Sequence, residues 1–176
     1  YIEEVMKYIL IVFCLLFSLG AKADELSVRI DELSVRILEM LFEKNNQICE
    51  SYNIGQYELG EYPITRIDIS NDGINDYIVD EGRGHCTESI ASPFWGTGGS
   101  PFIFYINPTL ENINAIQSFN QTIRSWKLID YEGKKAVKIQ IHGNYCSVDG
   151  ATGCYEILLF TDKGPKSVDG PHPNPK

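Results

Sequence analysis

The chain has 176 residues, 43% of them hydrophobic and 22% charged, and its formal net charge at pH 7 is −9. This length allows one domain. The excess of acidic over basic side chains, 24 against 15, argues against a nucleic-acid binder, which needs a basic face to neutralise phosphates. It also argues against an electrostatic anchor on an anionic membrane. The ordinary hydrophobic content indicates a folded protein.

A short apolar run near the N-terminus predicts a secretory signal peptide. It extends from Tyr8 to Leu19, after Met6 and a lysine, and ends before the small residues of Ala21-Lys-Ala23. The run is shorter than the ~20 residues that span a bilayer. We therefore expect cleavage before Asp24 and a periplasmic or secreted protein with no stable membrane anchor. Residues 1–5 precede the expected start and are interpreted as an untranslated leader, so that residues 1–23 lie outside the mature domain.

The cysteines that follow the signal peptide predict two disulfides. They are Cys49, Cys86, Cys146 and Cys154, an even number in an exported chain. Three pairings are possible, and the favoured one joins Cys49 to Cys86 and Cys146 to Cys154. A metal site formed by His142 with Cys146 and Cys154 is the alternative, but the close C-x-x-C spacing of zinc sites is absent.

The N-terminal part of the mature chain predicts one amphipathic helix. The segment 24–30 is repeated without change as 31–37, and seven residues are close to two helical turns, so the duplication keeps one apolar face. A coiled coil is the alternative, but two heptads are too few to support it. The apolar positions of this face are Leu26, Ile30, Leu33, Ile37 and Leu41.

The remainder of the chain predicts strands and turns. A hairpin is expected around Glu132-Gly133-Lys134, and the segment 113–119 fits either a helical turn or an irregular strand. Residues 164–176 are rich in proline and are expected to be a disordered tail. The fold class is therefore α+β within 24–163: an N-terminal amphipathic helix packed on a mainly antiparallel, disulfide-stabilised β-sheet. The expected strands cover 64–69, 77–79, 102–106, 126–131, 136–142 and 155–160.

One stretch predicts a cation site. It fits D-x-S-x-D-G-x-x-D, and calcium prefers oxygen ligands of this kind at weak, sub-millimolar to millimolar affinity in extracellular modules. Gly73 permits the turn that such a loop needs, whereas Val79 stands where an EF-hand has its bidentate Glu. An Asx-rich turn without an ion is the alternative. The expected calcium ligands are the side chains of Asp68, Ser70, Asp72 and Asp76 and the carbonyl of Ile74.

The residues 66–80 resemble the D-x-N-x-D-G-x-x-D signature of FG-GAP/VCBS-type repeats. The chain is similar to uncharacterised exported bacterial proteins with one such motif, followed by a cysteine and a Gly-rich segment with further cysteines. Here these parts correspond to Cys86 and to residues 94–100, where Trp95 and Ser100 replace the cysteines. The resemblance implies an exported protein with a cation loop and implies no activity.

Two classes of function follow from these features. The first is a calcium-binding module that contacts another exported protein, which is basic if complementary charge guides the pairing. One form of it is an inhibitor of an exported hydrolase such as lysozyme, with Tyr145, Ser147 and Asp149 as contacts. The second is a metal-dependent hydrolase that uses His85 or His142 as its base. Since no G-x-S-x-G or other nucleophile motif is present, a non-enzymatic role is favoured.

Overall fold

The computed structural model describes residues 32–113, 119–161 and 163–174. The chain divides into two compact units, residues 1–38 and 39–176. Residues 32–38 of the first unit are helical, and the helix continues to residue 51 in the second. The expected leader, signal peptide and first copy of the repeat lie outside the described residues. All contacts reported below lie within the second unit.

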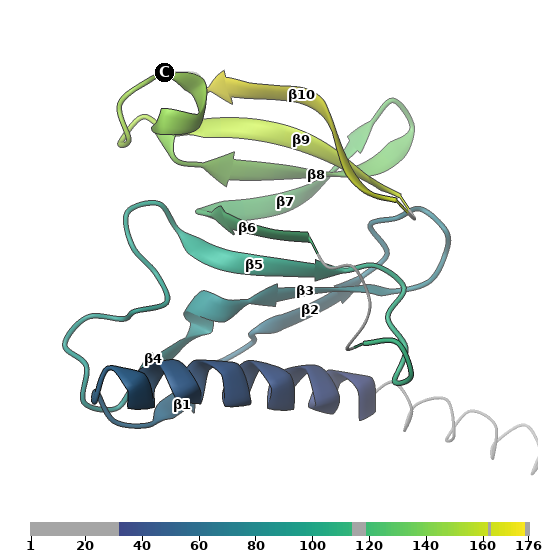
Figure 1. The fold of residues 1–176 in the computed structure, drawn as a ribbon. Helices are drawn as coiled ribbons and strands as arrows, with labels where there is room; N and C mark the ends of the chain where they lie inside the picture. The colour runs from purple at the N-terminus through teal and green to yellow at the C-terminus, as the bar shows by residue number, and fades with distance from the viewer. Residues whose placement is uncertain (1–31, 114–118, 162, 175–176) are drawn as a thin grey trace, which may run out of the picture. The chain divides into compact units, whose positions relative to one another are not determined.

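Two four-stranded antiparallel sheets make up most of the second unit (Figure 1). In both sheets the strands follow one another in chain order, and a two-stranded ribbon of β1 and β4 stands apart from them. The first sheet has the order β2 (Ile64–Ile67), β3 (Asp76–Asp80), β5 (Ser100–Tyr105) and β6 (Phe119–Ile123). The second contains β7 (Ser125–Tyr131), β8 (Lys134–Ile141), β9 (Cys154–Thr161) and β10 (Gly164–Pro173). The ribbon joins β1 (Tyr57–Leu59) to β4 (Gly84–Cys86), and the 3-10 turns are η1 (Glu81–Arg83) and η2 (Gly143–Cys146).

The expected class, mainly antiparallel sheet with a helix and two disulfides, is confirmed. The hairpin around Gly133 is also confirmed, because β7 pairs with β8 in register from Tyr131 and Lys134 outward. The segment whose structure the sequence left open contains the start of β6 at Phe119. The short strands β1 and β4 were not predicted, because three residues are too few to display an alternating pattern.

The C-terminal segment differs from the sequence prediction. The disordered tail expected at 164–176 is wrong for residues 164–173, which form β10 and pair with β9 from Gly164 opposite Thr161 to Pro173 opposite Cys154. A central strand donates backbone N–H groups to the strands on both of its sides, and proline has no N–H to donate. Because β10 lies at the edge of its sheet, one side of the strand needs no ladder hydrogen bonds, and Pro165 and Pro171 are tolerated there.

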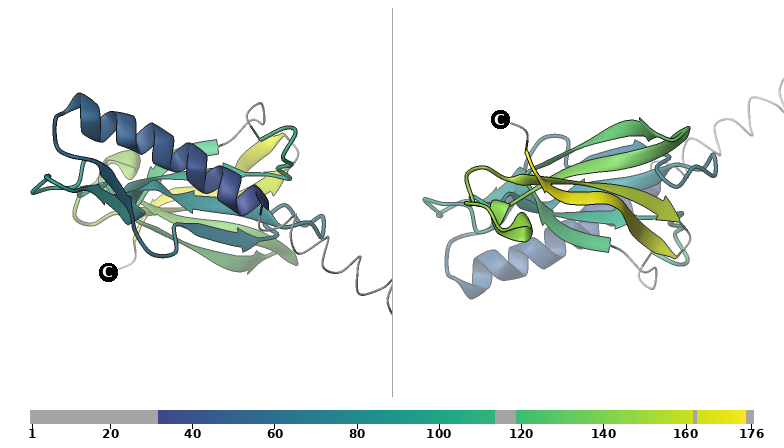
Figure 2. Two further views of the ribbon diagram at one scale, coloured as in Figure 1. Left: turned by 90° about the horizontal axis from the view of Figure 1, so that it is seen from below. Right: turned by 90° about the horizontal axis from the view of Figure 1, so that it is seen from above.

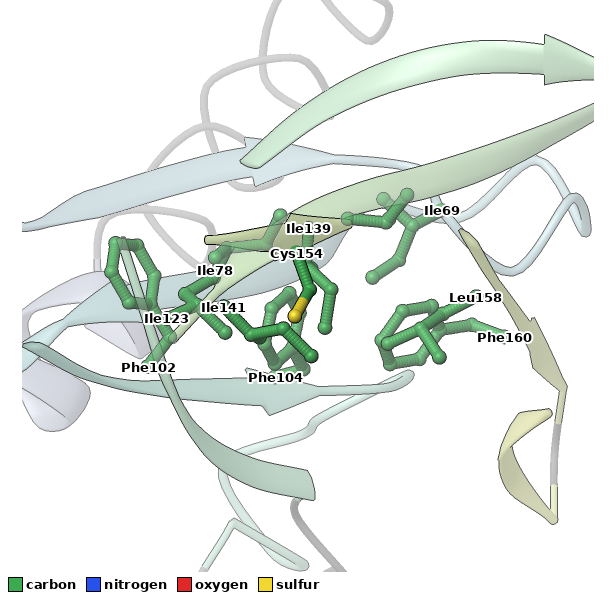
Figure 3. Packing of buried hydrophobic residues seen from close by; sticks show 11 residues of the cluster. Ile69, Ile78, Phe102, Phe104, Ile123, Ile139, Ile141, Cys154, Leu158 and Phe160 are labelled. Atoms are coloured by element: carbon green, nitrogen blue, oxygen red, sulfur yellow. The ribbon is translucent and has the colours of Figure 1, made fainter. Parts of the chain in front are cut away.

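The core lies between the two sheets. In Figure 3, side chains from both sheets gather in one cluster, and the rings of Phe104 and Phe160 stack with centroids 5.1 Å apart. In the view from above in Figure 2, the yellow-green strands of the second sheet lie in front of the teal strands of the first. The chain passes from β6 to β7 through Arg124 alone, whose N–H donates to the carbonyl of Gln140 at 2.7 Å. The two sheets therefore share a corner at this residue.

A second, smaller cluster surrounds the first disulfide. Cys49 of the helix is bonded to Cys86 of β4, and both are buried together with Tyr57 and Phe94. The rings of Tyr57 and Phe94 meet edge to face at 5.2 Å. The second disulfide joins Cys146 to Cys154 at the start of β9. Both pairings agree with the one favoured from the sequence.

Removing either disulfide should destabilise the protein, and the larger loss should come from the pair that closes the longer loop. Cross-linking restricts the unfolded chain more when more residues are enclosed. The separations are 37 residues for Cys49–Cys86 and 8 for Cys146–Cys154, so we expect losses of about 4 and about 2.5 kcal/mol. Urea unfolding of the double variants Cys49→Ala/Cys86→Ala and Cys146→Ala/Cys154→Ala measures both. Equal losses, or the reverse order, would contradict this expectation.

Candidate cation-binding loop

The candidate calcium ligands lie in the loop 68–76 between β2 and β3. The backbone of this loop is tightly turned, since Asn71 has φ 66° and Gly73 has φ 87°. Residues other than Gly, Asn and Asp rarely adopt this left-handed backbone conformation. The sequence N-D-G thus determines the local shape, and it places the three aspartates of the motif on one short turn.

Asp76 is the buried end of the loop. Its side chain is fully buried, and its Oδ2 accepts hydrogen bonds from the N–H groups of Ile69 at 2.8 Å and Ser70 at 3.0 Å. Its Oδ1 accepts a third from the N–H of Asn107 at 3.0 Å. A buried carboxylate is stable only when such partners replace water. Asp76 therefore connects the turn to the segment that follows β5.

Asp68 is neutralised by a lysine of the other sheet. The Lys135 ammonium lies 2.6 Å from Asp68 Oδ2, and the Asn71 N–H donates to Oδ1 at 2.8 Å. The hydrogen bond from Lys135 is the main reason that the pKa of Asp68 lies below its usual value. Because Lys135 belongs to β8, this ion pair joins the loop to the β7–β8 hairpin.

Asn71 strengthens the same junction with two hydrogen bonds. Its Nδ2 donates to the Lys135 carbonyl at 2.9 Å, and its Oδ1 accepts from the Lys135 N–H at 2.7 Å. The amide thus pairs with the backbone of Lys135 as a neighbouring strand would. The loop therefore links the first sheet to the second even without an ion.

Asp72 is the exposed carboxylate of the loop. Its Oδ1 accepts from the N–H of Ile74 at 2.8 Å, and its Oδ2 accepts from Asn107 Nδ2 at 2.5 Å. The Asn107 hydrogen bond is the largest cause of a lowered pKa at Asp72, followed by that of Ile74. This carboxylate is ionised at neutral pH and open to solvent, as a ligand of a weakly held cation must be.

Two buried side-chain oxygen atoms of residues near Asp72 lack hydrogen-bond partners. Ser70 Oγ and Asn107 Oδ1 are both buried and accept or donate no bond within the described part of the chain. The Ser70 hydroxyl lies close enough to Asp72 to contribute to its lowered pKa without meeting hydrogen-bond geometry. Hydroxyl and amide oxygens are hard ligands of the type that calcium binds. They are candidate ligands together with Asp72, because Asp72 is the exposed carboxylate of the loop, whereas Asp68 is paired with Lys135 and Asp76 is buried.

The sequence predicted Ser70 and missed Asn107. Asn107 follows β5, and its sequence signal, Asn-Pro after an apolar run, indicates only the end of a strand. Lys135 was missed for the same reason, because its contact with Asp68 spans 67 residues. Over residues 32–113, 119–161 and 163–174, no three or more His, Cys, Asp or Glu side chains lie together as a metal-binding group.

The two histidines considered as catalytic bases belong to different elements of the structure. His85 lies in the β1–β4 ribbon with its Nε2 3.4 Å from Glu58, and His142 accepts a hydrogen bond from the Asn144 N–H at the start of η2. The metal site considered for His142 with the two C-terminal cysteines is wrong, because Cys146 and Cys154 are joined to each other. A thiolate ligand requires a free thiol.

Comparison of the chain with protein-family models, with curated proteins and with solved structures gave no match. No helix in the described ranges is long and apolar enough to cross a membrane. The two disulfides are compatible with an extracellular or periplasmic protein.

Asp76→Asn should destabilise the protein strongly. The amide would offer one acceptor oxygen in place of two and would direct an NH₂ group toward an N–H donor, which leaves at least one buried N–H unpaired. Hydrogen bonds to a charged acceptor are worth about 1.5–3 kcal/mol, so the loss should reach about 3 kcal/mol in urea unfolding.

The matched control is Asp72→Asn in the same loop. Asp72 is exposed and its partners can bond to water, so its loss should be clearly smaller than that of Asp76→Asn. Similar losses for the two variants would show that the buried carboxylate does not hold the loop.

Proposed function

We propose that the chain is an exported, disulfide-bonded domain that binds another exported protein, and that its aspartate loop takes up a calcium ion in a structural role. The two disulfides carry the first part, because cystine bonds form and persist in oxidising compartments. The signal-peptide pattern of residues 6–23 supports the same compartment. A disulfide-constrained surface on a two-sheet body suits binding rather than chemistry, because the sequence contains no G-x-S-x-G or other nucleophile motif.

The proposal includes a helix that packs on the body of the protein. Leu41, Asn45 and Cys49 follow one another at four-residue spacing and are buried, as one face of a packed helix would be. The disulfide to Cys86 supports this arrangement, and so does the ion pair of Lys44 with the buried Glu81.

The calcium ion would be held chiefly by Asp72, with Ser70 Oγ and Asn107 Oδ1 as neutral oxygens and the Ile74 carbonyl as a further ligand. The buried, unpartnered state of the two neutral oxygens supports this set. Asp68 could join only when Lys135 leaves it, so the lysine competes with the ion. The weak affinity expected of an extracellular module follows from the single carboxylate in this set of ligands.

Calcium should therefore stabilise the protein, and Asp72→Asn should abolish the effect. With a dissociation constant of ~1 mM, 10 mM calcium chloride would add about 1.4 kcal/mol to the free energy of unfolding by mass action. Calorimetric titration and thermal melting measure the two effects. Lys135→Met should tighten binding, because it frees the Asp68 carboxylate.

Asp149→Asn is the control for the calcium experiment. Asp149 is likewise exposed, and hydrogen bonds from Thr152 likewise lower its pKa, but it lies in the Cys146–Cys154 loop. This variant should bind calcium as the wild type does. The calcium part of the proposal fails if the wild type gives no heat and an unchanged melting temperature.

The binding role is tested by photo-cross-linking in the native bacterium. A photoreactive phenylalanine derivative would replace Tyr145, which is 58% exposed in the disulfide loop, or Trp95, which is 63% exposed in the glycine-rich loop. We expect a discrete adduct with another exported protein, identified by mass spectrometry, at one of these positions. The same derivative at Tyr52, which is 69% exposed beyond the helix, is the control and should give no such adduct. Absence of an adduct at both test positions would refute the binding role.

A further inference from the structure

Three adjoining hollows lie along the corner between the two sheets and are together called the corner groove. Their volumes are about 390, 190 and 420 Å³. The first and the central hollow share Asp80, Arg83 and Arg124, and the central and the last share Ser125 and Trp126. The shared lining residues place the three hollows next to one another. The groove thus passes the point at which β6 turns into β7.

Large aromatic side chains border the corner groove and are left open to water. Tyr62 is 85% exposed and Trp95 is 63% exposed, whereas Trp126 is half-buried against the core. The neighbour of Trp95, Phe94, is buried beside the first disulfide, which holds the base of this loop in place. Trp, Tyr and Arg are the residue types that dominate binding energy at protein interfaces.

The charge of the corner groove is opposite to that of the whole chain. Four of its five charged lining residues are basic, although the chain carries −9 overall. The one acidic residue, Asp80, is already engaged by Arg83 at 3.0 Å and by Ser100 at 2.7 Å. The basic residues are Arg83, Arg124, Lys127 and Lys138.

The hydrogen-bond partners of Arg124 are neutral, so they leave its positive charge uncompensated. Its Nε donates to the Thr97 carbonyl at 3.0 Å, and its terminal nitrogens donate to the carbonyls of Gly150 and Ala151. Backbone carbonyls satisfy the donors without cancelling the positive charge. The same bonds fasten the glycine-rich loop and the disulfide loop to the corner between the sheets.

The wall of the corner groove is rigid at its glycine-rich end. Gly96 and Gly99 exchange two backbone hydrogen bonds of 3.0 Å, and Gly99 has φ 107°. A Cβ at Gly99 would lie 2.0 Å from the Ile123 carbonyl oxygen, so the loop approaches β6 as closely as the backbone allows. A preformed wall reduces the entropy lost when a ligand binds.

We propose that the corner groove binds an acidic polypeptide segment that carries one apolar or aromatic side chain. The carboxylates would meet basic residues whose charge is not paired with Asp80, Arg124 and Lys127 among them, and the apolar side chain would pack between Tyr62 and Trp95. Thr65 of β2 lines the central hollow, and β2 is an edge strand whose outer backbone groups can pair with an extended segment. This inference rests on the proposed protein-binding role and adds the surface and the local charge of the partner. The groove favours an acidic segment, whereas the net charge of the whole chain alone favours a basic partner.

Selection from a phage-displayed library of random dodecapeptides tests the proposal. Peptides that bind the wild-type protein should contain an excess of Asp and Glu around one apolar or aromatic residue. A synthetic peptide of the selected sequence is then titrated by fluorescence anisotropy. Trp95→Ala should weaken its binding by about 30-fold, as for a central interface residue, and Lys127→Gln by about 2–5-fold, as for a charge at the rim. Raising the sodium chloride concentration should also weaken it.

Two variants outside the corner groove are the matched controls. Tyr145→Ala removes an exposed aromatic ring and Lys166→Gln removes an exposed positive charge, and both should leave binding unchanged. Peptides rich in Lys and Arg, failure to select any peptide, or binding that Trp95→Ala leaves intact would overturn the proposal. Loss of binding in Tyr145→Ala alone would move the site to the disulfide loop and leave the protein-binding role standing. Tetragalacturonic acid is titrated in parallel, and its binding in place of the peptide, with dependence on Trp95, would identify an acidic glycan site instead.

Discussion

The rest of the loop region depends on the hydrogen bonds that the Asp76 carboxylate accepts. One ionised group, fully buried, accepts hydrogen bonds from the N–H groups of Ile69, Ser70 and Asn107. Those donors belong to two separate connections, the turn between β2 and β3 and the segment that follows β5. With the turn fixed in this way, Asp68 and Asn71 reach Lys135 in β8. A single carboxylate thus sets both the shape of the turn and its junction with the second sheet.

The same arrangement separates two roles within one acidic motif. Asp68 and Asp76 serve as acceptors for the protein's own donors, while Asp72 stays open to water. A motif that spaces carboxylates two residues apart directs them toward a common centre only if none has a better partner. Here Lys135 supplies a positive charge where an ion otherwise would. A cation that recruited Asp68 would therefore have to displace Lys135 and weaken the junction between the sheets.

Local features of the sequence predicted the elements, and long-range contacts limited the prediction. The hairpin around Gly133 and the strand 155–160 follow from short apolar and turn patterns. The edge strand β10 was missed, because composition alone does not show that a proline-rich segment pairs at a sheet edge. The aspartates of residues 68–76 indicated a turn, but its partners Asn107, which follows β5, and Lys135 of β8 are 31 or more residues away in the sequence. The corner groove had no sequence signal, because its basic and aromatic side chains come from β5, β7, β8, η1, Arg124 and two loops.

The Cys49–Cys86 disulfide has a topological consequence for the aspartate loop. Its ring of chain encloses β1, β2, the loop, β3 and η1, so the whole turn lies inside a covalent circle. When the protein unfolds with this disulfide intact, Cys49 and Cys86 stay covalently joined. The denatured ensemble of this segment is then more compact than that of an open chain. The bond thus reduces the conformational entropy that this segment loses when the turn and its strands form.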